Sequence, residues 1–185
     1  PYLTMLPRFE AKVLEVFAGL VERGLVYRGL KPVHWSIENQ TALADAELEY
    51  YEREDTSVFV LFEIADGAKL PASLNALSGK PRFLMIWTTT PWTLPANMAV
   101  AVSEAAEYGL YPIGDDKCAV IACDLAPSVL EHGGVGKAEP LGTCRGGELL
   151  DVTYQHPFVD RVGTVVTADY VTLEDGTGMV HTAPG

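Results

Sequence analysis

The residues best suited to chemistry lie in one stretch, Trp87–Asn97, which reads WTTTPWTLPAN and carries no charged side chain. Four threonines fall within six of its positions: Thr88, Thr89, Thr90 and Thr93. Hydroxyls donate and accept hydrogen bonds without placing a charge beside a bound molecule. Such a stretch could hold a small substrate, and its two tryptophans favour a functional role. The same residues also allow an alternative, a threonine-rich edge strand that ends in a proline turn.

A second candidate is the segment Asp175–Gly185, DGTGMVHTAPG. Asp175 and Gly176 predict a turn, and Gly178 permits a close approach of the backbone. His181 follows an apolar pair at the expected end of a strand. A histidine in that position is more often structural than catalytic, so it becomes a site residue only together with other groups.

The other three histidines carry no comparable signal. His34 and His132 stand next to no other candidate group, and His156, which precedes Pro157, is interpreted as a turn residue.

The sequence lacks the familiar patterns of nucleophilic and metal chemistry. Cys118, Cys123 and Cys144 have no CxxC spacing, which argues against a disulfide framework and a zinc knuckle. Gly146-Gly147 is not followed by Gly-Lys-Ser/Thr, and there is no GxSxG elbow. An acidic run is interpreted as a solvated face: Asp45, Glu47, Glu49, Glu52, Glu54 and Asp55.

Short β-type runs separated by turn residues follow from about Ala42. They are Val58–Ile64, Phe83–Thr88, Met98–Val102, Tyr108–Ile113, Cys118–Cys123, Thr164–Thr167 and Gly178–His181. Leu125–His132 is the one helix expected among them. This pattern predicts a mainly β fold with some α, built on a mixed or antiparallel barrel-like sheet. Pro91 has no N–H for a ladder, so the second run should end in an irregular loop that carries the threonines.

The beginning of the sequence differs from the rest. Apolar residues at helical spacing predict an amphipathic helix over about residues 8–23, with Pro7 in its first turn and Gly24 past its end. An isolated helix cannot bury its apolar stripe without a partner. We therefore expect residues 1–44 to be a flank or linker of a larger protein and 45–185 to be the barrel-like domain, with the boundary near residues 40–48. Both ends of the sequence look cut.

Composition narrows the classes of function. The 185 residues carry a net charge of -12 and are 48% hydrophobic, which excludes a disordered chain. The apolar runs are too short to span a bilayer and no signal peptide precedes them, so we expect a cytoplasmic protein with no membrane partner. The negative charge argues against a broad duplex-binding surface. It leaves room for a site that takes only one end of a nucleic acid.

Four segments resemble the isoleucyl-tRNA synthetase family. They match the editing domain (connective polypeptide 1) inserted into the class I catalytic domain, with a flank of that catalytic domain at the N-terminus. The segments are KPVHW (Lys31–Trp35), TALADAELEY (Thr41–Tyr50), WTTTPWTLPAN (Trp87–Asn97) and GTGMVHTAPG (Gly176–Gly185). The match covers essentially the whole chain. Valyl and leucyl relatives carry a Thr-Arg-Pro form of the threonine-rich peptide, so Trp92 disfavours an equivalent domain from those enzymes.

The resemblance implies hydrolysis of misactivated valine, as valyl-adenylate or valyl-tRNA, in a parent protein that ligates isoleucine to its tRNA. It implies catalytic roles for Thr88, Thr89, Thr90, Thr93 and His181 and substrate-binding roles for Trp92, Asn97 and Gly178. Water would be the nucleophile, with no metal or cofactor in this segment, since ATP and magnesium belong to the parent catalytic domain. The implied partners are the acceptor end of isoleucine tRNA, valyl-adenylate and the rest of the synthetase chain.

Two departures from the family pattern matter. Ser36 and Asn39 stand where many relatives carry zinc-binding cysteines, and both are poor zinc ligands, so we expect that site to be lost. The family's aspartate that anchors the substrate's α-amino group lies beyond Gly185, so we expect weakened hydrolysis. A catalytically inactive binding or structural barrel is therefore the alternative function.

Overall fold

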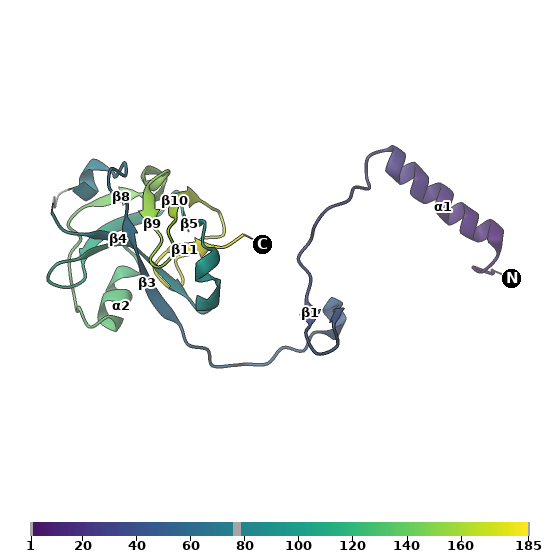
Figure 1. The fold of residues 1–185 in the computed structure, drawn as a ribbon, viewed down its shortest axis with the longest axis horizontal. Coiled ribbons are helices and arrows are strands. Elements are labelled where there is room, and N and C mark those ends of the chain that lie inside the picture. Colours follow the sequence, from purple (N-terminus) through teal and green to yellow (C-terminus); the bar gives the residue numbers. More distant parts are fainter. Residues whose placement is uncertain (1, 76–78, 185) are drawn as a thin grey trace. The chain divides into compact units, whose positions relative to one another are not determined.

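The computed structural model describes residues 2–75 and 79–184, which form two compact units, Pro1–Glu52 and Arg53–Gly185 (Figure 1). The division falls later than the expected boundary at residues 44 and 45. Asp45–Glu47 form a short 3-10 turn, η1, that is continuous with the first unit, and the first long strand starts only at Val58.

The first unit contains a helix and a small hairpin. Helix α1 (Pro7–Glu22) has a proline in its first turn and is followed by Gly24 at φ 70°, the left-handed conformation that ends helices. None of its residues is buried. Strands β1 (Trp35–Ser36) and β2 (Thr41–Ala42) pair antiparallel.

The β1–β2 turn contains the two positions that were considered for zinc. The Asn39 backbone N–H donates to the Ser36 hydroxyl at 3.2 Å, so the two residues close a turn with each other. Among the described residues, His, Cys, Asp and Glu side chains form no group of three that could hold a metal ion.

The second unit is built on one sheet of nine strands, as expected for a mainly β fold. Its order is β11-β5-β10-β9-β3-β4-β7-β6-β8. The strands are β3 (Val58–Ile64), β4 (Arg82–Thr88), β5 (Ala99–Val102), β6 (Glu107–Pro112), β7 (Cys118–Ala122), β8 (Thr143–Arg145), β9 (Thr153–Gln155), β10 (Val162–Thr167) and β11 (Met179–Thr182). The β5–β10 and β4–β7 pairs are parallel and the others are antiparallel.

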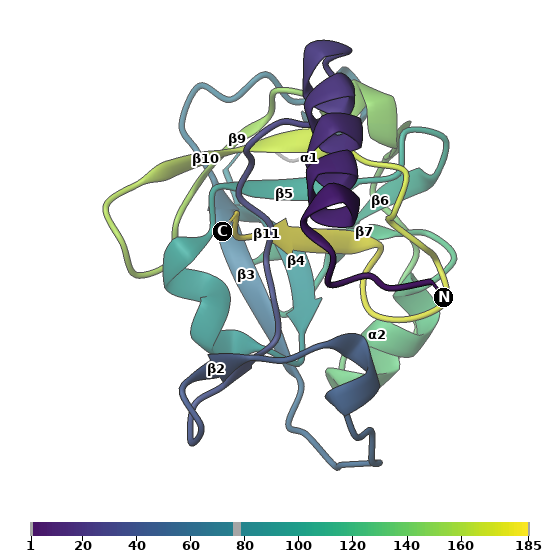
Figure 2. The same ribbon diagram turned by 90° about the vertical axis from the view of Figure 1, so that its right-hand side faces the viewer.

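The sheet is strongly curled but hydrogen-bonded as an open sheet. Its two edges are β11 and β8, and β11 packs against β4 without forming a ladder with it (Figure 2). The sheet is therefore barrel-like in its curvature, as expected, but its edge strands β11 and β8 are not hydrogen-bonded to each other to form a closed barrel.

Alternation along the strands divides the core into two clusters. On β4, Leu84 and Ile86 face the main core, while Met85 faces a smaller cluster with Ile121 of β7. Helix α2 (Ala126–His132) covers that smaller cluster with Ala126, Val129 and Leu130. Both faces of β4 and β7 are thus buried, and every residue of β7 is buried.

Two strands of this sheet were not predicted, β8 and β9. Each has three residues, which is too short to display alternation, and β9 reads Thr-Tyr-Gln. Tertiary pairing decides these elements, because β9 is held between β3 and β10. Three 3-10 turns also lie in this unit: η2 (Ala72–Asn75), η3 (Pro91–Ala96) and η4 (Gly146–Leu149).

Close backbone packing at Gly146 generates a test of this fold. A Cβ atom at Gly146 would lie 2.0 Å from the Ser103 carbonyl oxygen, so Gly146→Ala must displace backbone. We expect this substitution to lower the free energy of unfolding by about 3 kcal/mol, measured by urea denaturation. Gly133→Ala is the matched control, because Gly133 has φ -76° and its nearest neighbour would lie at 3.5 Å. Equal stability of the two variants would contradict this packing.

Candidate active site

The threonine-rich loop and the C-terminal motif meet at the ends of two paired strands. The loop leads through η3 into β5, and β11 pairs antiparallel with β5 so that His181 lies opposite Val100. This register places the His181 Nε2 atom 2.8 Å from the Thr93 hydroxyl oxygen. Two motifs that are far apart in the sequence thus form one cluster, as expected.

Local hydrogen bonds shape the loop after β4. The Thr88 hydroxyl accepts a hydrogen bond from the Thr90 backbone N–H at 3.0 Å and lies 3.2 Å from the Thr90 hydroxyl. Pro91 then begins η3, where a missing N–H costs nothing. The Thr93 hydroxyl donates to the Thr90 carbonyl oxygen at 2.8 Å. The hydroxyls of Thr88 and Thr93 therefore form hydrogen bonds within their own loop.

The threonine-rich edge strand, the alternative considered from the sequence, is wrong. Strand β4 lies between β3 and β7, and Thr89 and Thr90 lie beyond its end.

Asn97 links the loop to β5 and to His181. Its side-chain nitrogen donates to the Ala99 carbonyl oxygen at 2.9 Å and lies 3.4 Å from His181 Nδ1. Only 1% of Asn97 is exposed. Asn97 is therefore a buried residue whose hydrogen bonds hold the loop and His181 together.

The surroundings of His181 disfavour its protonated form. Burial lowers its pKa from the ordinary value near 6.5, and the neighbouring His156 lowers it further. Both ring nitrogens face partners, Thr93 and Asn97. The ring is therefore arranged to position the loop, and neither nitrogen is free to take a proton from a water molecule.

The other predicted site residues divide by exposure. Thr89, Thr90 and Trp92 are exposed, with 69% of Trp92 accessible, so these side chains are free to meet a bound molecule. Thr88 is buried, as is Gly178.

Gly178 does not join the cluster. It has φ 71°, and a Cβ atom there would lie 2.4 Å from Ala122 Cβ, while its carbonyl oxygen accepts from the Tyr108 hydroxyl at 2.6 Å. Its observed contacts are with the core of the sheet. Gly176, nearer the start of the same motif, packs on the ring of Trp87 instead.

Three residues hold the loop from the β9–β10 hairpin, and the sequence singled out none of them for this role. The Tyr154 hydroxyl donates to Asn97 Oδ1 at 2.6 Å, and Arg161 Nη1 donates to the Asn97 carbonyl oxygen at 2.8 Å. His156 is a turn residue as predicted, since its Nδ1 accepts from the backbone N–H groups of Phe158 and Val159. Its Nε2 also lies 2.8 Å from the Leu94 carbonyl oxygen. No motif or spacing marks these contacts.

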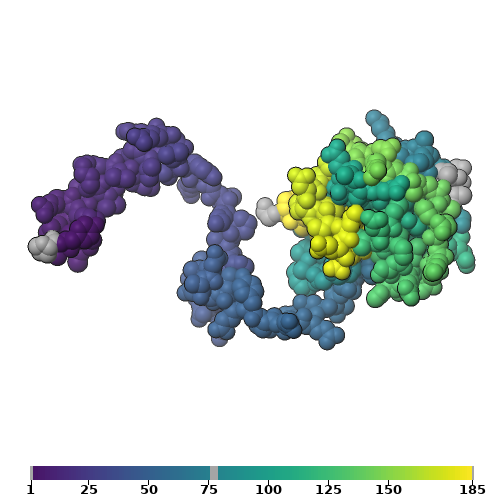
Figure 3. Space-filling view, turned by 180° about the vertical axis from the view of Figure 1, so that it is seen from behind, coloured from purple at the N-terminus to yellow at the C-terminus, as the bar shows by residue number. Residues whose placement is uncertain are grey.

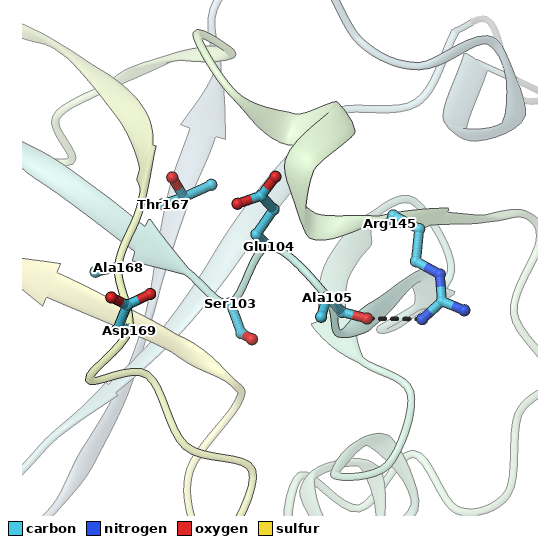
Figure 4. Close-up of a pocket in the computed structure, with 7 residues that line it drawn as sticks. All are labelled: Ser103, Glu104, Ala105, Arg145, Thr167, Ala168 and Asp169. Carbon is cyan, nitrogen blue, oxygen red and sulfur yellow. Dashed lines mark hydrogen bonds between the residues drawn. The ribbon is translucent and has the colours of Figure 1, made fainter.

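A hollow in the surface of the second unit lies away from this cluster. A hollow of about 970 Å³ is lined by Ser103, Glu104, Ala105, Arg145, Thr167, Ala168 and Asp169 (Figure 4). The Arg145 guanidinium donates to the Ala105 carbonyl oxygen, and the lining includes no predicted site residue. Figure 3 shows the last residues of the chain (yellow) as part of the exposed surface of this unit.

Comparison with known proteins places the chain in a family. The family described as tRNA synthetases class I (I, L, M and V) matches residues 1–174, and the chain belongs to it. It is 47% identical to the isoleucine–tRNA ligase of Symbiobacterium thermophilum and 43% identical to that of Caldicellulosiruptor saccharolyticus, each over 100% of the chain. The chain spans only 19% and 20% of the length of these relatives.

Solved structures give the fold. The crystal structure of GlLeuRS-CP1 matches 70% of this chain and 55% of its own with a TM-score of 0.58 at 18% identity. The P. knowlesi cytosolic leucyl-tRNA synthetase editing domain matches 73% of this chain and 62% of its own with a TM-score of 0.56 at 13% identity. The chain therefore shares the fold of synthetase editing domains. In the described part of the chain, no helix has the length and apolar character needed to cross a membrane.

The neutral state of His181 predicts how stability depends on pH. Unfolding returns its pKa to about 6.5, above the value in the folded protein. The unfolded chain then binds more protons, so the free energy of unfolding should fall as the pH decreases from about 6.5 toward the lower folded pKa. We expect His181→Gln to make this decrease smaller, measured by urea denaturation across that range. Exposed His34 provides the control variant His34→Gln; an equal pH dependence in both variants would contradict the assignment.

Proposed function

We propose that the second unit is the editing site of an isoleucyl-tRNA synthetase and hydrolyses valine that has been attached by mistake. The contact between Thr93 and His181 carries this proposal, because it joins two of the four segments on which the family resemblance rests. The names of the relatives, isoleucine–tRNA ligases, support the choice of amino acid. The parent protein would ligate isoleucine to its tRNA with ATP and magnesium bound outside these residues, in the cytoplasm.

The size of the substrate explains why a second site is needed. Valine and isoleucine differ by one methylene, and a pocket gains only about 1–3 kcal/mol from that difference; isoleucyl-tRNA synthetase is itself the standard example of this limit. A separate hydrolytic site that admits valine and excludes isoleucine multiplies the discrimination. Valyl-adenylate and the acceptor end of valyl-tRNA are the proposed substrates. The chain's net charge of -12 disfavours an extended RNA-binding surface and is compatible only with a site that takes one end of the RNA.

The proposed reaction needs orientation of water more than an activated side chain. The oxygen of a water molecule bonds to the acyl carbon, the bond from that carbon to the ribose or phosphate oxygen breaks, and the water proton ends on the leaving oxygen. The exposed hydroxyls of Thr89 and Thr90 would hold the ester and the water, while Thr93 would wall the pocket. Trp92 would cover the nucleotide end of the substrate.

A binding or structural module without catalysis is the second candidate. Both ring nitrogens of His181 are engaged, and no carboxylate belongs to the cluster of Thr93, Asn97 and His181. A site of that kind would bind the acceptor end and leave the ester intact.

Deacylation separates these candidates. The purified chain is incubated with valyl-tRNA and, as the matched substrate, isoleucyl-tRNA. Faster release of valine is expected. Binding of valyl-tRNA without release would favour the non-catalytic module, and equal release of both amino acids would overturn the proposed specificity.

The wall role of Thr93 predicts a change in selectivity. Thr93→Ala should enlarge the pocket and lower the preference for valyl-tRNA over isoleucyl-tRNA by about tenfold, and Thr90→Ala should act in the same direction. Thr93→Val is the matched control, since it keeps the volume and removes only the hydroxyl. It should slow both reactions and keep their ratio. An unchanged ratio in Thr93→Ala, measured by initial rates of deacylation, would exclude a wall role.

A further inference from the structure

Tyr154 reaches the candidate site from β9, across the intervening strand β10. It is fully buried on β9, and its hydroxyl donates to Asn97 Oδ1 at 2.6 Å. The β9–β10 ladder pairs Tyr154 with Gly163, and a Cβ atom on Gly163 would lie 2.4 Å from the Tyr154 hydroxyl oxygen. Only glycine leaves room for the phenol to cross β10. Phe62 packs edge-on against the same ring.

The chemistry of each partner fixes the direction of the hydrogen bonds. The Ala99 carbonyl oxygen can only accept, so the nitrogen of the Asn97 amide must face it, at 2.9 Å. The amide oxygen therefore faces Tyr154, which must donate. The amide nitrogen also faces His181 Nδ1 at 3.4 Å, and a donor there requires Nδ1 to be unprotonated.

The single ring N–H hydrogen of neutral His181 must then be on Nε2. With Nδ1 as acceptor, Nε2 carries the hydrogen and donates to the Thr93 hydroxyl oxygen at 2.8 Å. The Thr93 hydroxyl in turn donates to the Thr90 carbonyl oxygen at 2.8 Å. Every donor in this series points the same way, from β9 toward the loop.

We infer that Tyr154 is a positioning residue for the candidate site, because its donation to Asn97 Oδ1, together with the Ala99 carbonyl oxygen, holds the Asn97 amide in the orientation that keeps His181 in the Nε2–H form that donates to Thr93. Its effect on catalysis rests on the proposed hydrolysis. Its effect on the histidine does not, because the tautomer is a property of the free protein.

The tautomer is read directly from the intact chain labelled with ¹⁵N-histidine. Long-range ¹H–¹⁵N spectra distinguish a protonated from an unprotonated ring nitrogen, and His181→Gln identifies the His181 signals. We expect Nε2 protonated and Nδ1 unprotonated at neutral pH. A protonated Nδ1 would overturn the inference, whatever the variants do.

Tyr154→Phe removes only the hydroxyl at the head of the series. Asn97 Oδ1 is then buried without its donor, so the amide should turn or admit water, and the His181 proton should divide between both nitrogens. We expect kcat for valyl-tRNA to fall by about tenfold or more while KM stays within about threefold. Gly163→Ala, which displaces the ring and keeps the hydroxyl, should give the same two changes.

Tyr111→Phe is the matched control. Tyr111 is a buried tyrosine on β6 that packs in the smaller core cluster, outside the candidate site. It should leave the His181 spectrum and kcat unchanged. An unchanged His181 spectrum in Tyr154→Phe would overturn the inference, even if kcat fell. A changed spectrum in a chain that hydrolyses neither valyl-tRNA nor isoleucyl-tRNA would support the positioning role and reject the proposed function.

Discussion

The pairing of β11 with β5 is the interaction on which the candidate site depends. It runs over Met179–Thr182 and Ala99–Val102, and it extends past the strand end, where the Met98 N–H donates to the Thr182 carbonyl oxygen. A slip of one residue would turn His181 to the opposite face of the sheet. The turn before β11 is fixed by Gly178, whose lack of a side chain allows contact with Ala122, and by the Tyr108 hydroxyl. The register of one short ladder thus decides whether Thr93 and His181 meet.

Exposure separates two roles within the threonine-rich loop. Thr88 and Asn97 are buried, and their polar side-chain atoms form hydrogen bonds with the loop and contact His181. Thr89, Thr90 and Trp92 are accessible. Buried hydrogen-bonded groups hold their geometry because leaving any of them unpaired is costly. The accessible side chains are thereby presented on a rigid support, as a site that orients a water molecule requires.

Much of this arrangement could be predicted from the sequence, and the reasons are local. The run Val58–Ile64 matches β3 residue for residue, and proline marks the point where β4 gives way to η3. The contact between Thr93 and His181 could be predicted only from the family resemblance, because the spacing of the two segments in the sequence does not indicate it. The contacts of Tyr154, His156 and Arg161 with the loop escaped prediction because their partners are the amide oxygen of Asn97 and backbone carbonyls of the loop, which have no sequence signature. Strand β9 escaped because three residues are too few for a pattern.

The position of β5 in the sheet has a consequence for the order of assembly. Its two neighbours, β10 and β11, both lie far downstream in the chain, and Thr93 and His181 are 88 residues apart. At synthesis rates of about 5–20 residues per second, the loop is synthesised roughly ten seconds before its histidine partner. Contacts of such long range also close slowly, because the entropy of the intervening loop is lost first. The candidate site is therefore among the last parts of the domain to form, and the nascent β5 must wait with both of its edges unpaired.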